Sequence, residues 1–374
     1  MKLYLVAGEA SGDARGAELM RALLESDSAF EFFGAGGREM RALAGGDFLD
    51  WADEAVVGLW DVLKKYGYFK AQFDRMLADI GRVAPAALIL IDYPGFNLRL
   101  AKAVRARHPA VKIIYYISPQ VWAWNRGRIP KMARMLDLML CIFPFEKPLY
   151  EQSGLKTIFV GHPMIDSFAT KKTEAARDRN CVGIFPGSRE KEVRKILPVM
   201  LAAACEMRRR QPELQFVVVA ASAPLAEIAE KLVFGPGEAG ANLVCTVATG
   251  GAHEMMQRVG AGMVASGTAT LEAAYFGMPL VILYKVAWLT WVVGKRLVRV
   301  PFLGMPNILA GREIAREFLQ EAAQPEAIAT EMHRLLTDEN ARATIQRDLA
   351  EVAAKLGEPG AASRAADAIC AELR

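Results

Sequence analysis

A single aspartate, Asp92, follows directly after an apolar run at residues 87–91 that is typical of a buried strand. Its carboxylate is therefore expected at the carboxyl end of that strand, where ligands bind in parallel sheets. Asn97 is the better candidate for the N-cap of the helix expected at 98–107, so Asp92 is free for chemistry. As a general base it would take a proton from an attacking hydroxyl, which typically contributes ~10²–10⁴-fold to the rate. The alternative is a structural turn in which Asp92 bonds its own backbone.

A strand-to-helix junction in the second half has the chemistry of a diphosphate site. Gly187, Ser188 and Arg189 follow an apolar run at 181–185 and precede a helix rich in Glu and Lys. Glycine lets a backbone approach a ligand closely, the helix start offers free N–H groups, and arginine binds phosphate oxygens in pairs. Taken alone, the junction is also ordinary capping chemistry.

A second junction strengthens this interpretation. Ser266, Gly267 and Thr268 follow an apolar run at 262–265, and Glu272 lies in the first turns of the next helix. A carboxylate at that position can accept hydrogen bonds from ribose hydroxyls. The two junctions together predict a nucleoside diphosphate as ligand.

The turn after the first apolar run, at 3–7, is unsuited to a dinucleotide. Its glycines lie at positions 8, 12 and 16, which is not the GxGxxG spacing. Glu9 and Asp13 would also place negative charge where a pyrophosphate needs N–H donors. A loop that binds substrate hydroxyls through Glu9, Ser11, Gly12 and Asp13 suits these residues better. A tight turn with Ser11 or Asp13 as helix cap is an equal alternative.

Further candidates are weaker when taken singly. Asn307, Arg312 and Glu313 place an amide, a cation and an acid on one glycine-containing turn, although each type is common in capping and at surfaces. His162 is either a ligand contact near a hinge or a turn residue without a role. The four histidines are too far apart in sequence to indicate a metal site.

Five of the six tryptophans lie in three segments that also carry positive charge. Aromatic and basic surfaces are typical of contact with anionic lipid, while core packing and a protein interface are the alternatives. In the first segment, Trp60 and Tyr68 are expected on one helix face beside lysines. The segments combine Trp60 with Lys64 and Lys65, Trp122 and Trp124 with Arg126 and Arg128, and Trp288 and Trp291 with Lys295 and Arg296.

The elements that must position these residues alternate between strand and helix. We predict an α/β protein of two facing, doubly wound, Rossmann-like domains with a crevice between them and a helical C-terminal tail. The expected bounds are 1–170, a linker at 171–180, 181–350, and a helix at 351–374 that packs on the first domain or on a neighbouring chain. Apolar runs typical of buried parallel strands lie at 3–7, 87–91, 112–117, 138–143, 181–185, 215–220, 243–246, 262–265 and 280–284.

Composition excludes several classes of protein. The 374 residues are 53% hydrophobic and carry a net charge of only +4, spread evenly, which excludes a large nucleic-acid-binding face. Five cysteines without CxxC spacing indicate buried thiols and neither a disulfide framework nor a zinc site. Turn residues interrupt the apolar stretch at 260–284, so it is expected as strand, turn, helix and strand. The short N-terminal apolar run is no signal peptide, which predicts a cytoplasmic protein.

Together the motifs resemble those of the lipid-A-disaccharide synthases, a family of inverting glycosyltransferases with two Rossmann-like domains of GT-B type. Tyr93 and Gly95 depart from the family pattern, which affects acceptor contacts and leaves the aspartate in place. The matching segments are GEASGD at 8–13, DYPGFN at 92–97, SPQVWAW at 118–124, FPFEK at 143–147, GHP at 161–163, PGSR at 186–189, SGTATLE at 266–272 and PNILAGRE at 306–313.

The resemblance implies transfer of 2,3-diacylglucosamine from its UDP donor to the 6-hydroxyl of 2,3-diacylglucosamine 1-phosphate, with no metal or cofactor. Asp92 would be the base, although Glu9 and Asp13 stay open as alternatives. The implied location is the cytoplasmic face of the inner membrane as a peripheral protein, and a homodimer is compatible with it. The implied donor contacts are Arg189 and residues 266–268 to the diphosphate, Glu272 to the ribose, and Asn307, Arg312 and Glu313 to the rest of the donor.

Two other functions compete with this interpretation. A UDP-N-acetylglucosamine 2-epimerase, or another UDP-sugar glycosyltransferase of the same architecture, would use the same junctions, and dependence on acyl chains distinguishes them. A non-catalytic sugar-nucleotide or lipid-binding protein would not need a carboxylate at the end of a strand, so Asp92 disfavours it.

Overall fold

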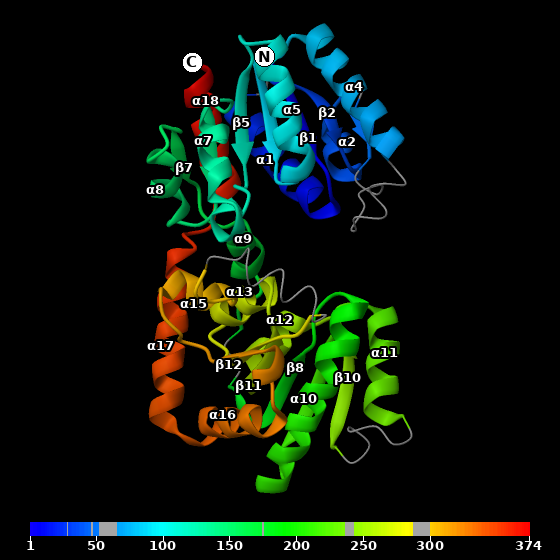
Figure 1. The fold of residues 1–374 in the computed structure, drawn as a ribbon, viewed down its shortest axis with the longest axis vertical. Coiled ribbons are helices and arrows are strands. Elements are labelled where there is room, and N and C mark those ends of the chain that lie inside the picture. Colours follow the sequence, from blue (N-terminus) through cyan, green and yellow to red (C-terminus); the bar gives the residue numbers. More distant parts are fainter. Residues whose placement is uncertain (28, 46–47, 52–65, 174–175, 236–242, 287–299) are drawn as a thin grey trace. The chain divides into compact units, whose positions relative to one another are not determined.

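The computed structural model describes residues 1–374 apart from 28, 46–47, 52–65, 174–175, 236–242 and 287–299, and it divides into two compact units (Figure 1). The first unit comprises Met1–Ser167 and Leu356–Arg374, and the second comprises Phe168–Lys355. The chain therefore passes from one unit to the other twice. The linker expected at 171–180 lies in the second unit, where its last three residues begin a strand.

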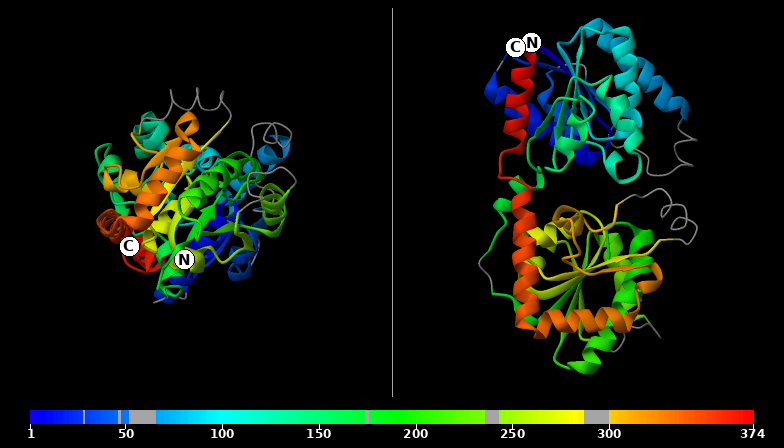
Figure 2. Two further views of the ribbon diagram at one scale, coloured as in Figure 1. Left: turned by 90° about the horizontal axis from the view of Figure 1, so that it is seen from below. Right: turned by 60° about the vertical axis from the view of Figure 1, so that its left-hand side comes forward.

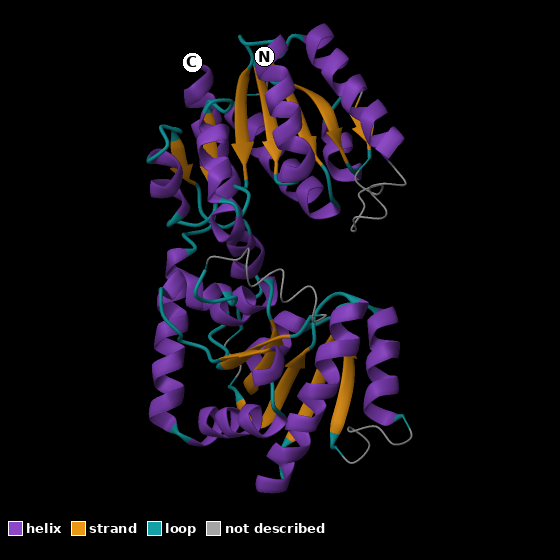
Figure 3. Cartoon of the chain, viewed as in Figure 1, coloured by secondary structure: helices purple, strands orange, loops and turns teal. Residues whose placement is uncertain are grey.

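In the part of the chain that is described, the first unit has a seven-stranded parallel sheet in the order β3-β2-β1-β4-β5-β6-β7 (Figure 3). Along the interior strand β1, Leu3 and Leu5 enter one core while Tyr4 and Val6 enter the other. This alternation is what a strand buried on both faces requires. The strands are β1 (Lys2–Ala7), β2 (Glu31–Gly36), β3 (Phe48–Asp50), β4 (Ala87–Ile91), β5 (Lys112–Tyr116), β6 (Leu138–Cys141) and β7 (Thr157–Phe159).

Helices cover both faces of this sheet. The core that contains Leu5 is closed by α1, α2 and α18, and the core that contains Val6 is closed by α4, α5 and α7. The helices are α1 (Ala10–Ser26), α2 (Arg38–Leu43), α4 (Tyr66–Val83), α5 (Pro94–Arg107), α6 (Val121–Trp124), η2 (Arg126–Arg128), α7 (Ile129–Ala133), α8 (Glu146–Glu151), α9 (Met164–Ala169) and α18 (Ala361–Leu373).

The second unit, within its described residues, has a six-stranded parallel sheet in the order β10-β9-β8-β11-β12-β13. Its strands are β8 (Asp178–Phe185), β9 (Gln215–Ala220), β10 (Cys245–Thr249), β11 (Val259–Ala265), β12 (Leu280–Tyr284) and β13 (Glu317–Leu319). Its helices are α10 (Glu190–Arg210), α11 (Ala223–Phe234), α12 (Ala252–Arg258), α13 (Thr268–Tyr275), α15 (Met305–Ala310), η3 (Gln320–Ala322), α16 (Pro325–Thr337) and α17 (Glu339–Lys355).

The two doubly wound α/β sheets and the helical tail confirm the predicted fold class. Residues 260–284 form β11, α13 and β12, as the interrupting turns indicated. Over the described ranges, no helix has the length and apolarity that crossing a membrane requires. The sequence does not predict β2, β3, β7 or β13. Three of these have only three residues, and β2 contains Gly34, where any Cβ would collide with the carbonyl of Leu5.

The predicted cap of α5 is wrong. The helix begins at Pro94 rather than after Asn97, because proline suits the first helical turn, where no N–H is needed. Asn97 therefore lies inside the helix, and its buried side-chain amide donates to the carbonyls of Ile91 and Asp92 at 3.2 and 2.8 Å. It fixes the backbone at the end of β4 instead of capping α5.

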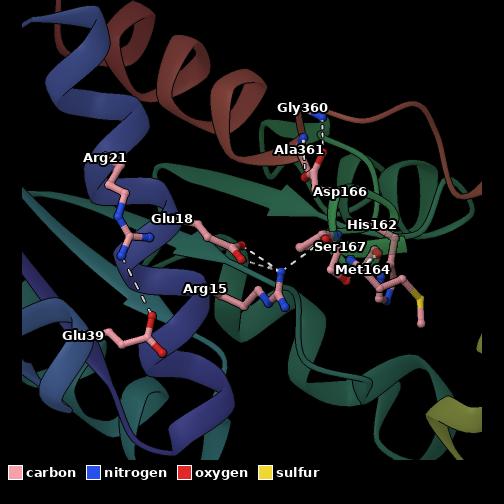
Figure 4. Close-up of polar contacts among 11 residues, drawn as sticks. Arg15, Glu18, Arg21, Glu39, His162, Met164, Asp166, Ser167, Gly360 and Ala361 are labelled. Atoms are coloured by element: carbon pink, nitrogen blue, oxygen red, sulfur yellow. Dashed lines mark hydrogen bonds and ion pairs between the residues drawn. The ribbon is translucent and has the colours of Figure 1, made fainter. Parts of the chain in front are cut away.

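The last helix, α18, belongs to the first unit, where both chain termini lie (Figure 2). Ala365 and Ile369 join the core that Leu19 and Leu23 of α1 also enter. The Asp166 carboxylate accepts from the backbone N–H groups of Gly360 and Ala361, so it caps the start of α18 from a distant part of the chain (Figure 4).

We predict that Asp166→Ala lowers the free energy of unfolding by about 1–2 kcal/mol, because it removes the cap of α18. Urea denaturation measures this. Asp367→Ala, at an exposed position of the same helix, is the matched control and should change stability by less than about 0.5 kcal/mol. Equal losses in the two variants would contradict the capping role.

Candidate active site

The first candidate site lies where the strand order of the first sheet reverses. β1 and β4 are neighbours with Ala7 opposite Ile91, yet each is followed by a helix on a different face of the sheet. Such a reversal leaves open space at the carboxyl ends of the two strands, which is where ligands bind in these folds. Glu9 follows β1 and Asp92 follows β4, so the structure brings both carboxylates to this edge.

Asp92 is held in a strained turn. Asp92 and Tyr93 both adopt left-handed backbone conformations, with φ of 45° and 48°, which is uncommon for residues other than glycine. The Asp92 carbonyl accepts from the hydroxyl of Tyr115 at 2.5 Å, and its N–H donates to the carbonyl of Tyr116 at 3.0 Å. Strain of this kind persists where the surroundings impose it and is concentrated at functional sites.

The electrostatic surroundings of Asp92 favour a proton acceptor. Burial raises the pKa of its carboxyl above the usual value, and the negative charge of Glu9 raises it further, against a hydrogen bond from the Tyr93 backbone. A carboxylate with a raised pKa is a stronger base than an exposed one. The geometry and the charge at this edge of the first sheet are both compatible with Asp92 as the predicted base.

Asp13 has a structural role. It is 6% exposed, and its carboxylate accepts from the N–H groups of Gly37, Glu39 and Met40 at 2.8, 2.9 and 3.0 Å, which caps α2. Because the carboxylate oxygens are occupied by these three backbone donors, they are not available to a substrate hydroxyl. Ser11 is exposed and Gly12 buried in the first turn of α1, and Glu9 is the exposed residue before that helix.

The second candidate site lies at the corresponding reversal of the second sheet. β8 and β11 are neighbours with Phe185 opposite Val264, so the two sequence-predicted junctions start from adjacent strand ends. Gly187 has a φ of +110°, and a Cβ there would lie 2.8 Å from the Glu192 carboxylate. Only glycine therefore allows this tight turn into α10.

Arg189 stands at the N-cap of α10, after the exposed Ser188. Its side chain is 69% exposed and forms an ion pair with Glu192 at 3.1 Å. Such an exposed pair contributes little to stability, so the guanidinium can exchange this carboxylate for a ligand at small cost. The free N–H groups of the 21-residue helix α10 lie beside it.

The adjacent junction begins α13. The Ser266 hydroxyl donates to the carbonyl of Leu303 at 3.1 Å, which ties the end of β11 to the loop before α15. The hydroxyl of Thr270 donates to the carbonyl of Gly267 at 2.7 Å, and Thr268 is exposed at the helix start. The strand end, the turn and the helix start are thus fixed by local contacts.

Glu272 has a partner that the sequence does not indicate. His253 Nε2 lies 3.1 Å from Glu272 Oε2, and Lys171 Nζ lies 3.3 Å from His253 Nδ1. An ammonium group can only donate, so Nδ1 accepts and Nε2 carries the ring proton that is donated to Glu272. The ring packs against Phe168 and Phe276, with centroid distances of 4.7 and 5.5 Å. This chain of contacts fixes the orientation of Glu272.

Asn307 is fully buried and all its hydrogen-bonding positions are occupied. Its amide donates to the carbonyl of Ala315 at 2.7 Å and to the Glu317 carboxylate at 2.8 Å. Its oxygen accepts from the N–H groups of Ile314 and Ala315 at 2.9 and 3.0 Å. The residue therefore shapes the loop between α15 and β13, and a donor contact would have to replace one of these bonds.

Arg312 and Glu313 lie on that same loop. Arg312 forms an ion pair with the buried Asp348 of α17 at 2.8 Å, which holds the pKa of that carboxyl below its usual value. Glu313 Oε1 accepts from the N–H of Glu317 at 3.1 Å. These contacts connect α15, β13 and α17 within the second unit.

The chain matches the family model described as lipid-A-disaccharide synthetase over residues 3–371. It is 45% identical to the lipid-A-disaccharide synthase of Trichlorobacter lovleyi over 98% of this chain and 96% of that protein. The enzyme of the same name from Geobacter sulfurreducens is 42% identical over 98% of this chain and 95% of that protein.

The chain belongs to the lipid-A-disaccharide synthase family. The resemblance seen in the motifs is thereby confirmed, and the chain is a glycosyltransferase of lipid A biosynthesis. Membership of this family also excludes the two alternative functions, a UDP-N-acetylglucosamine 2-epimerase and a non-catalytic binding protein.

Solved structures of other proteins share the fold of the synthase. A UDP-GlcNAc 2-epimerase from Neisseria meningitidis matches with a TM-score of 0.59 at 10% identity, over 100% of this chain and 99% of that one. MurG from Acinetobacter baumannii matches with a TM-score of 0.56 at 13% identity, over 99% of both chains. At such identities the likeness concerns the fold alone, and it confirms the GT-B architecture.

The aromatic and basic segments of this synthase can be compared with the prediction only in part. Trp60, Trp288 and Trp291 lie outside the described residues. Tyr68 is half-buried, with its ring 5.7 Å from that of Phe69. In the remaining segment the two tryptophans differ, because Trp122 is buried and Trp124 is 44% exposed.

His162, which lies beside Met164 in Figure 4, connects the two stretches of chain that leave and re-enter the first unit. Its N–H donates to the carbonyl of Leu356 at 2.8 Å, and its ring Nδ1 accepts from the N–H of Met164 at 3.2 Å. Burial and the charge of Arg15 lower the pKa of the ring to about 4, so His162 is neutral at neutral pH. Arg15 itself bonds the carbonyl of Pro163 at 3.2 Å.

The five cysteines of the synthase are free thiols. Cys141 is buried as expected, whereas the other four are half-buried, which corrects the prediction that all are buried. Among the residues that the structure describes, no group of three or more His, Cys, Asp or Glu side chains could hold a metal ion.

Glu146 is a buried acid that joins two of the family motifs. It is 0% exposed, and its carboxyl accepts from the indole N–H of Trp122 at 2.8 Å and from the N–H of Phe143 at 3.1 Å. Burial raises its pKa to about 7. The sequence offered no sign of this, because an acid in FPFEK has the pattern of a surface residue.

We predict that the contribution of Glu146 to the free energy of unfolding falls as the pH rises from about 4.5 to about 7, because the unfolded chain releases this proton at lower pH than the folded one. The free energy of unfolding of Glu146→Gln, minus that of the unmodified protein, should therefore be larger at pH 8 than at pH 5 by on the order of 3 kcal/mol. Urea denaturation at the two pH values measures this, with the exposed Glu151→Gln on the same helix as control. A Glu146→Gln effect that does not change with pH would contradict it.

Proposed function

We propose that the enzyme transfers 2,3-diacylglucosamine from UDP-2,3-diacylglucosamine to the 6-hydroxyl of 2,3-diacylglucosamine 1-phosphate. Membership of the family over almost the whole chain carries this proposal. The products are the β-1′,6-linked disaccharide 1-phosphate and UDP. The first unit is proposed to bind the acceptor and to supply the base, and the second unit to bind the donor.

In the proposed reaction, the Asp92 carboxylate takes the proton of the acceptor 6-hydroxyl as that oxygen attacks C1 of the donor sugar. The bond between C1 and the diphosphate oxygen breaks on the opposite side, which inverts the configuration. The strained turn and the raised pKa of Asp92 support this role. The negative charge of Glu9 supports this role because it raises the pKa of Asp92. Asp13 is disfavoured as the base because its carboxylate caps α2.

UDP leaves with negative charge that must be stabilised. We propose that Arg189, the backbone around Gly187 and Ser188, and the start of α13 at residues 266–268 bind the diphosphate. Cationic side chains and helix N-termini then supply the charge that a metal would otherwise provide. Glu272, oriented by His253, accepts from the ribose hydroxyls.

Both proposed substrates carry acyl chains, so we propose that the enzyme works as a peripheral protein at the cytoplasmic face of the inner membrane. It stays a prediction that Trp60, Trp288 and Trp291 take part in this membrane contact. It also stays a prediction that the enzyme forms a homodimer.

Asp92→Asn should lower kcat by about 10²–10⁴-fold while leaving UDP binding unchanged, because asparagine keeps the shape of the side chain but cannot take the proton. Initial rates of disaccharide formation and titration with UDP measure the two effects. Glu9→Gln is the comparison variant and should keep most of the turnover. If Asp92→Asn turns over normally and Glu9→Gln does not, Glu9 is the base.

Arg189→Ala should weaken UDP binding and slow transfer by about tenfold or more, as expected when a charge-assisted hydrogen bond is lost. Arg194→Ala removes another exposed arginine of α10, paired with Glu190 at 2.7 Å, and should leave both quantities unchanged. Isothermal titration with UDP and initial rates are the measurements. Unchanged UDP affinity in Arg189→Ala would remove Arg189 from the diphosphate site.

A further inference from the structure

The stretch of chain after β5 carries concentrated positive charge. We call residues 121–134, which contain α6, η2 and α7, the basic segment. Between Asp92 and Asp137 the sequence has nine Lys or Arg residues and no Asp or Glu. This contrasts with the small net charge of +4 for the whole chain. Four of the nine cations lie in the basic segment: Arg126, Arg128, Lys131 and Arg134.

These four cations lack counterions within the described structure, where no carboxylate lies within ion-pair distance of them. Elsewhere in the chain, exposed arginines have carboxylates close by, such as Glu190 for Arg194 at 2.7 Å and Glu331 for Arg334 at 2.6 Å. A cluster of cations that is left unpaired is suited to binding an anionic ligand.

Two of the cations are held in place by the tryptophans of the segment. The Arg128 guanidinium lies over the ring of Trp124 at 4.9 Å, and Trp124 is 44% exposed. Arg126 Nε donates to the carbonyl of Trp122 at 3.0 Å. These contacts leave the terminal N–H groups of both guanidiniums free of protein acceptors among the described residues. Guanidinium groups held in this way match the oxygens of a phosphate.

The basic segment is anchored near the predicted base. The N–H of Asp92 bonds the carbonyl of Tyr116 at the end of β5, the strand next to β4. Just beyond that end, the carbonyl of Pro119 accepts from the hydroxyl of Tyr150 at 3.0 Å. The indole of Trp122 donates to the buried Glu146 at 2.8 Å. Buried contacts therefore fix the start of the segment at the sheet edge that carries Asp92.

We propose that Arg126 and Arg128 bind the phosphate monoester of the acceptor substrate. This inference rests on the proposed function, in which the acceptor carries a 1-phosphate. A phosphate held beside the strand next to Asp92 anchors the acceptor, so that its 6-hydroxyl is presented to the base. The two arginines thereby also select phosphorylated over unphosphorylated acceptors, because an uncharged acceptor leaves them unpaired.

The test compares two acceptors, 2,3-diacylglucosamine 1-phosphate and the same lipid without its phosphate, in detergent with saturating UDP donor. For the unmodified enzyme, kcat/KM should favour the phosphorylated acceptor. The double variant Arg126→Gln with Arg128→Gln should lose about tenfold or more in kcat/KM on that acceptor. It should stay within about twofold on the unphosphorylated one and keep its KM for the donor. Arg107→Gln, at an exposed position of α5 outside the basic segment, is the matched control and should keep the preference.

The possible outcomes are distinct. Transfer to the phosphorylated acceptor by the unmodified enzyme tests the proposed function itself, and its absence would overturn both proposals. If transfer occurs but the double variant keeps the phosphate preference, the function stands and the assignment of Arg126 and Arg128 falls. The assignment also falls if the variant loses only its sedimentation with vesicles of anionic phospholipid, since the arginines would then bind membrane headgroups. Thermal denaturation of each variant shows that it is folded, and the single variant Arg128→Gln provides an independent measurement.

Discussion

The reversal of strand order in each parallel sheet is the constraint on which the candidate active site depends. At β1 and β4, and again at β8 and β11, neighbouring strands send their following helices to opposite faces, so that two turns meet at one edge. Every residue proposed to act on the donor diphosphate or on the acceptor hydroxyl belongs to one of these four turns. The turn at Asp92 is additionally strained, which requires the surrounding hydrogen bonds of Tyr115, Tyr116 and Asn97.

A second group of polar residues fixes other loops and helix starts from within the protein. Asp13, Glu146 and Asn307 are buried, and each accepts two or more hydrogen bonds from groups that would otherwise be unpaired. Unpaired buried polar groups are costly, so such residues are constrained as strongly as those that contact a ligand. This explains why family motifs contain both kinds of residue.

Much of the fold follows from patterns that are local in the sequence. Buried parallel strands are continuous apolar runs, so the runs at 87–91, 215–220 and 280–284 locate their strands to the residue. Short strands such as β3 have no such pattern. The roles of Asp13 and His253 could not be predicted either, because their partners lie far away in sequence. Asp13 accepts from the N–H of Gly37, which is 24 residues further along the chain. His253 contacts Lys171, which is 82 residues before it. The position of Asp92 was predictable because it depends only on the strand before it.

The most direct test of the account is the identity and linkage of the product. The purified enzyme is incubated with UDP-2,3-diacylglucosamine and 2,3-diacylglucosamine 1-phosphate, and the lipid product is analysed by mass spectrometry and by NMR of its anomeric proton. The account predicts one disaccharide monophosphate with a β-1′,6 linkage for each UDP released. An α linkage would contradict direct displacement assisted by Asp92, and a 2-epimerised UDP-sugar without disaccharide would contradict the transfer itself.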